Sequence, residues 1–212
     1  MSEFIIGPFI IWLPKVFLGT AFVLLFFVYA AENFLERKGK ARPRFFNKIY
    51  RLLPIVLTFF YVFYASIETI AQYYVWSHDS FSKLFLPPHQ NLSYFLFYSF
   101  GRFWLNIILA ITASFVFYFL LKFLRKYRER FFKEGETELG LISALISGWP
   151  GIVIFIPLVF VITVILSTIR LTVFKLKTTT LGLPFIFSVA VIFVWSLLSD
   201  PISFFHLTVL KI

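Results

Sequence analysis

Residues 132–151 read FKEGETELGLISALISGWPG, and this stretch decides how the second half of the chain folds. Its apolar run, Leu139–Ile169, has 31 residues and is broken at Trp149-Pro150-Gly151, which is a strong turn signal. A single membrane span needs only about 20 residues. The sequence therefore favours a helical hairpin that turns back at the break over a single crossing, because the hairpin keeps Arg170, Lys175 and Lys177 on the same side as the other basic segments. Its short first arm would reach about half the depth of a bilayer, so other helices must bury it.

The composition predicts that the whole chain lies in a membrane. Its 212 residues have a mean hydropathy of +0.89, and 14% are charged, whereas soluble domains have about 25% charged residues. We therefore expect one all-α polytopic integral membrane domain over residues 1–212, with four clear transmembrane helices plus the broken or re-entrant hairpin. The four predicted spans are Val16–Ala31, Leu52–Tyr74, Tyr94–Leu121 and Leu183–Ser199.

The basic residues are clustered in two short segments between apolar runs. Of the 20 lysines and arginines, 7 lie between Glu32 and Arg51 and 6 lie between Lys122 and Lys133. This pattern is typical of cytoplasmic loops that attract anionic lipid headgroups, and it disfavours nucleic acid as a partner. The residues expected to dock on headgroups or on a partner subunit are Arg37, Lys38, Lys40, Arg42, Arg125, Lys126 and Arg128.

Polar residues inside the predicted spans mark a second candidate site. Glu68 is the one acid within a clear span, and Gln72 follows one helical turn later. Arg102 and Asn106 have the same spacing in the third span. We expect Glu68 to face Arg102 as a structural ion pair, with a transport path as the alternative. The chain has no cysteine, and its three histidines lack a metal-ligand spacing, so we expect no metal and no other cofactor.

The glutamates before the hairpin, Glu134, Glu136 and Glu138, have two possible roles. Acidic side chains favour helix N-termini because the exposed N–H groups there carry partial positive charge, and Thr137 would then be the N-cap. Alternatively, one glutamate belongs to a pair of acids that share a water, one acting as base and the other as acid.

The second possibility rests on a resemblance. Gly135-Glu136 is followed by TELGLISALISGWPG, a span, the basic segment RLTVFKLKTTT and then LGLPFIFSVAVIF. This order resembles the membrane domain of the prepilin and preflagellin peptidases, whose members have an aspartate where this chain has Glu136. The resemblance implies a first acid about seven residues before a proline. Glu36, which precedes Pro43, has this spacing, and so does Asn47, although an asparagine is no general base.

Three functions are compatible with these patterns. The leading hypothesis is a non-catalytic subunit or accessory protein of a larger membrane complex, with prepilin-peptidase-like ancestry, whose partners are the bilayer, anionic headgroups and other membrane subunits. The second is a membrane peptidase of the aspartyl type that uses Glu136 and Glu36. The third is a small transporter or channel component that uses Glu68 and Arg102. The expected location is a bacterial or archaeal cytoplasmic membrane, or an organellar inner membrane.

Overall fold

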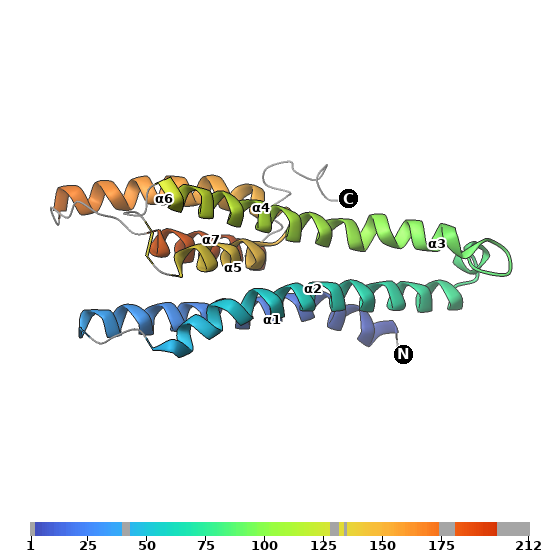
Figure 1. Ribbon diagram of the computed structural model, residues 1–212. Coiled ribbons are helices and arrows are strands. Elements are labelled where there is room, and N and C mark those ends of the chain that lie inside the picture. Colours follow the sequence, from blue (N-terminus) through green and yellow to red (C-terminus); the bar gives the residue numbers. More distant parts are fainter. Residues whose placement is uncertain (1–2, 40–42, 128–131, 134, 174–180, 199–212) are drawn as a thin grey trace.

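The computed structural model describes residues 3–39, 43–127, 132–133, 135–173 and 181–198, and all regular structure within them is helical. This result confirms the predicted all-α membrane fold (Figure 1). The helices in chain order are α1 Glu3–Arg37, α2 Arg44–His78, η1 Ser82–Phe85, α3 Leu92–Ser99, η2 Phe100–Trp104, α4 Leu105–Tyr127, α5 Glu136–Ser147, α6 Gly151–Val173 and α7 Gly182–Leu198.

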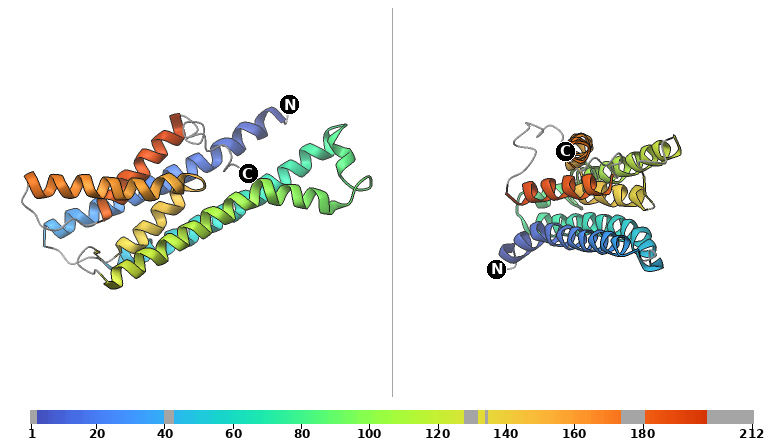
Figure 2. Two further views of the ribbon diagram at one scale, coloured as in Figure 1. Left: turned by 90° about the horizontal axis from the view of Figure 1, so that it is seen from above. Right: turned by 90° about the vertical axis from the view of Figure 1, so that its left-hand side faces the viewer.

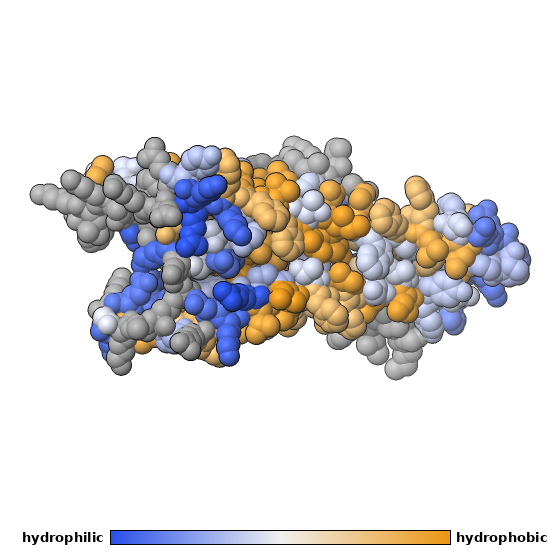
Figure 3. Space-filling model, in the orientation of Figure 1, coloured by the Kyte–Doolittle hydropathy of each residue, from blue (hydrophilic) through white to orange (hydrophobic). Residues whose placement is uncertain are grey.

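Four helical stretches are long and apolar enough to cross a bilayer: Trp12–Glu36, Phe45–His78, Leu92–Tyr127 and Gly151–Thr172. Three of them contain predicted spans, but the fourth lies in α6 and not at the predicted span Leu183–Ser199. The helix at that position, α7, has 17 residues within the described part of the chain, and Ser199 lies outside it. A helix of this length is shorter than the about 20 residues of a full span. Figure 3 shows a hydrophobic band across the middle of the molecule and hydrophilic residues toward both ends.

The predicted hairpin is present and consists of α5 and α6. The chain turns after Ser147, where Gly148 has a φ of 58°. The start of α5 and the end of α6 therefore lie at the same end of the molecule (Figure 1). Helix α5 has 12 residues and is almost wholly buried against α2, α4 and α7. The hydroxyl of Tyr61 donates at 2.6 Å to the carbonyl of Leu145, which also accepts from the N–H of Gly148 at the end of α5. A half-depth helix is stable in a membrane under these conditions because its backbone and side chains are enclosed by protein.

The helices continue beyond the predicted spans at the basic end of the molecule. We use this term for the end formed by the α1–α2 connection, the last turns of α4 and α6, and the first turns of α5 and α7. The predicted loop Glu32–Arg51 is mostly helical, because α1 runs to Arg37 and α2 begins at Arg44. Gly39, with a φ of 67°, and Pro43, the N-cap of α2, are the first residues that favour a break.

At the opposite end, the chain forms a helical arm that extends away from the bundle (Figures 1 and 2). Helix α2 has 35 residues, which is about 52 Å of helix and exceeds the roughly 30 Å of a hydrocarbon core. We call residues 72–104 the aromatic arm. In it, Trp76 of α2 packs on Phe95 and Tyr98 of α3 with ring centroids 5.4 Å and 4.8 Å apart. These contacts hold the two antiparallel helices together beyond the bundle.

Candidate functional site

The buried carboxylate of Glu136 joins three segments at the basic end. Only 4% of this residue is exposed. Its Oε1 accepts a hydrogen bond from the N–H of Gly182 at 2.9 Å, and its Oε2 accepts from the N–H groups of Lys133 at 3.0 Å and Leu181 at 3.4 Å. The first N–H groups of a helix have no partner within the helix and attract negative charge. Glu136 therefore caps the start of α7 and also fixes the turn before its own helix.

The sequence was misleading about how α5 begins. Its N-cap is Gly135, which has a φ of 86°, and not Thr137. Thr137 is buried within the first turn, and its hydroxyl donates to Oε2 of Glu138 at 2.8 Å. Glu134 lies outside the described residues. Thus the expectation of an acidic helix start holds for Glu136, but the helix that its side chain caps is α7.

The second predicted acid, Glu36, has a different partner. Its Oε2 forms an ion pair with Nζ of Lys133 at 2.6 Å, with both side chains more than 40% exposed. Lys133 thus contacts both predicted catalytic acids, Glu36 through its ammonium group and Glu136 through its backbone N–H. Asn47, the alternative position for the first acid, is exposed on α2. Of these two positions, Glu36 lines the same small cavity as Glu136 and Asn47 does not.

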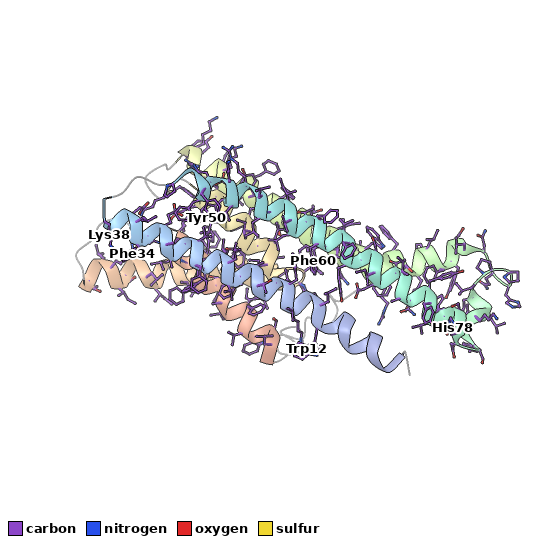
Figure 4. All side chains as sticks on the ribbon, turned by 90° about the horizontal axis from the view of Figure 1, so that it is seen from below. Trp12, Phe34, Lys38, Tyr50, Phe60 and His78 are labelled. Carbon is purple, nitrogen blue, oxygen red and sulfur yellow. The ribbon has the colours of Figure 1, made fainter. Side chains whose placement is uncertain are left out.

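A cavity of about 20 Å³ lies among these groups, which is room for about one water molecule. Glu32, a residue that the sequence analysis did not select, also contributes to it, and its Oε2 accepts a hydrogen bond from the hydroxyl of Tyr50 at 2.9 Å. Figure 4 shows Tyr50 on α2 near the basic end. The i, i+4 spacing of Glu32 and Glu36 along α1 was a signal that both acids share a helix face. The residues that line the cavity are Tyr29, Glu32, Asn33, Glu36, Tyr50, Lys133, Gly135, Glu136 and Leu139.

Burial raises the pKa of Glu136 above its ordinary value, and the three backbone N–H donors and the charge of Lys133 oppose this effect. A pair of catalytic acids requires carboxyl oxygens that can exchange protons with a shared water. Both oxygens of Glu136 are instead engaged by main-chain donors, and Glu36 is bound by a lysine. In this arrangement the acids connect segments of the fold.

The expected ion pair between Glu68 and Arg102 does not form. Glu68 is half-buried on α2, and the exposed Arg102 acts on it only through space. The polar contact between α2 and η2 is a hydrogen bond of 3.1 Å from Nε1 of Trp104 to the hydroxyl of Thr69. An indole ring reaches across to the neighbouring helix here, so the two helices are joined without a charge pair.

The two residues predicted beside this pair have separate locations. Gln72 is half-buried in α2. Asn106 donates to the carbonyl of Arg102 at 3.3 Å and lines a cavity of about 220 Å³ beside the turn of the hairpin. Neither Glu68 nor Arg102 lines that cavity. The four polar residues therefore do not converge on one site.

The basic residues predicted to dock on headgroups are partly described. Lys38 is exposed, and its Nζ lies 4.3 Å from the centroid of the Phe34 ring (Figure 4). In the last turn of α4, Arg125 is half-buried and Lys126 is exposed. The remaining predicted side chains, those of Arg37, Lys40, Arg42 and Arg128, lie outside the described part of the structure.

Within the described residues, no group of three or more His, Asp or Glu side chains is arranged to hold a metal ion. Comparison of the chain with protein-family models, with curated proteins and with solved structures gives no match.

Proposed function

We propose that this chain is a non-catalytic integral membrane subunit or accessory protein of a larger membrane complex, with a prepilin-peptidase-like ancestry. The observation that carries the proposal is the state of Glu136, whose two carboxylate oxygens accept three backbone hydrogen bonds. A carboxylate held in this way stabilises the packing of α5 and α7. It has little freedom to take and return protons during a reaction.

The ion pair of Glu36 supports the same conclusion. An acid that shares a catalytic water needs an accessible oxygen and a partner acid. Oε2 of Glu36 is 2.6 Å from Nζ of Lys133, so this oxygen is already engaged by a cation. In this proposal, Glu36 and Glu136 lie at the same end of the bundle, as two catalytic acids would, but each of them fixes the position of a neighbouring segment.

A two-acid peptidase is the second candidate because Glu32, Glu36 and Glu136 line the same water-sized cavity. For catalysis, at least one of these acids would have to release its present partner and bind the water. The transport hypothesis has weaker support, because neither Glu68 nor Arg102 lines the described cavity beside the hairpin turn.

The aromatic arm is the surface that we propose for the partner subunit. If the basic end lies in the cytoplasm, about 20 residues of α2 and of α4 cross the hydrocarbon, and the arm then stands at or beyond the outer interface. Phe97 of α3 is 80% exposed and Phe81 is 69% exposed. Large exposed aromatic side chains outside the hydrocarbon core are typical of protein contact sites.

A photo-crosslinking amino acid at Phe97 tests this proposal in the native membrane. The matched control is Val164, which is 65% exposed on α6 in the stretch Gly151–Thr172 that is long and apolar enough to cross a bilayer. We expect a discrete protein adduct from position 97 and only lipid adducts from position 164. The adduct should persist in a Glu36→Gln background, because binding does not need that acid. Absence of a protein adduct at position 97, or equal adducts at both positions, would contradict the proposal.

A further inference from the structure

A second feature of the bundle, independent of the proposed function, is a lateral groove of about 770 Å³ between α2 and α4. Its size lies within the range of about 300–1,000 Å³ that is typical of sites for small ligands. Figure 3 views the molecule from the side on which α2 and α4 lie in front. The residues that line the groove are Tyr50, Arg51, Pro54, Ile55, Thr58, Phe59, Val62, Phe115, Tyr118, Glu138 and Leu141.

The groove is a consequence of the short helix α5, which packs against both α2 and α4 and separates them. Leu141 of α5 is 5% exposed and lies at the base of the groove, whereas Ile55 and Phe59 on the α2 wall are 65% and 71% exposed. The walls are thus apolar and open toward the surrounding membrane. A hydrocarbon chain is the occupant that such walls accept without unsatisfied polar groups.

The mouth of the groove at the basic end is positively charged. Arg51 is exposed there and forms no hydrogen bond or ion pair with any described residue. Lys122 is one turn beyond Tyr118 on α4, and its Nζ lies 6.0 Å from the centroid of the Tyr118 ring. Glu138 contributes one acid, whose Oε2 accepts from Thr137. Two cations and one acid leave a net positive charge, which complements an anionic headgroup.

The depth of the groove matches one leaflet. From Tyr50 to Val62, α2 advances by about 18 Å, close to the roughly 15 Å of hydrocarbon in half a bilayer. We propose that the groove binds one molecule of phosphatidylglycerol. Its phosphate contacts Arg51 and Lys122, a headgroup hydroxyl donates to Glu138, and one acyl chain lies along α2. The net negative charge of this lipid distinguishes it from phosphatidylcholine, which has no headgroup hydroxyl.

The absence of cysteine from the chain allows a probe to be placed directly in the groove. Thr58→Cys, labelled with bimane, lies on the groove wall, and Val164→Cys on α6 is the matched lipid-facing reference. The purified, labelled protein is reconstituted in phosphatidylcholine vesicles that contain a small mole fraction of either phosphatidylglycerol or phosphatidylcholine with brominated chains, which quench bimane on contact.

We expect brominated phosphatidylglycerol to quench the Thr58→Cys label at a mole fraction about fivefold lower than brominated phosphatidylcholine requires. A factor of this size corresponds to the attraction between one cation near the membrane surface and an anionic headgroup. Arg51→Gln should remove the difference, whereas Lys126→Gln, an exposed cation outside the groove, should preserve it. Both lipids should quench the Val164→Cys label equally.

Equal quenching at Thr58→Cys in the parent would overturn the proposal in favour of bulk lipid. Absence of quenching by either lipid would mean that a protein helix covers the groove, and would overturn it too.

Discussion

The N–H of Gly182 donates to Oε1 of Glu136 at 2.9 Å across 46 residues of chain. This bond connects the first residue of α5 with the first residue of α7. Both helices begin at the basic end and are shorter than a full span. Because each depends on its neighbours for burial, a buried link between their starting points fixes the position of the whole hairpin relative to α7.

The pH dependence of stability provides a first prediction. The pKa of Glu136 is raised in the folded protein, mainly by burial, above its ordinary value of 4.5. Between these two values the folded state binds more protons than the unfolded state, so this contribution to stability is greatest below 4.5 and is lost as the pH rises through the folded pKa. Glu136→Gln lacks this titration. The difference in unfolding midpoint between parent and variant should therefore increase as the pH falls from about 8 to about 5.

Thermal unfolding in detergent, followed by circular dichroism at several pH values, measures this difference. A difference that stays constant or decreases toward low pH would contradict the account.

Gly182 itself should tolerate no larger residue. A Cβ at this position would lie 2.6 Å from Cε2 and 2.8 Å from Oη of Tyr29, and this ring also lines the cavity beside Glu136. We expect Gly182→Ala to lower the free energy of unfolding by about 1–3 kcal/mol, the usual effect of overpacking. Gly101→Ala is the control, because a Cβ there meets no atom within 4 Å. Equal unfolding midpoints for the two variants would show that the start of α7 has room to move.

The hairpin predicts which side of the membrane each segment faces. Single cysteines replace Ser80 in the loop before α3, Lys126 at the end of α4 and Leu171 at the end of α6, all of which are exposed. A thiol reagent that cannot cross the membrane should label Ser80→Cys from one side, and both Lys126→Cys and Leu171→Cys from the other. Labelling of Leu171→Cys together with Ser80→Cys would mean that α5 and α6 cross the bilayer once as a single span.

The hairpin could be predicted because its signals are local. The Trp149-Pro150-Gly151 break interrupts an apolar run that is too long for one span, and the basic residues after it favour a return to the first side. The extent of the helices at the basic end was predicted less well. Hydropathy marks where a chain leaves the hydrocarbon, but it does not mark where a helix ends. Helix α1 continues beyond the apolar run to Arg37, close to Gly39, the first residue that favours a break.

The partners of the polar side chains could not be predicted in the same way. Glu136 was expected to cap its own helix, because sequence spacing does not show that the fold places Gly182 against its carboxylate. The opposite charges of Glu68 and Arg102 predicted an ion pair, whereas the polar contact that forms between these helices is the hydrogen bond from Trp104 to Thr69.

The central claim is that Glu136 holds the fold together and does not act as a catalytic acid. The most direct measurement is the unfolding midpoint of the parent, of Glu136→Gln and of Glu36→Gln under one condition. Either orientation of the amide in Glu136→Gln places an NH₂ group against a backbone N–H, so we predict a loss of about 1–3 kcal/mol. Glu36→Gln removes only an exposed ion pair and should cost less than about 1 kcal/mol. A Glu136→Gln variant as stable as the parent, or more stable, would contradict the account and favour a catalytic acid.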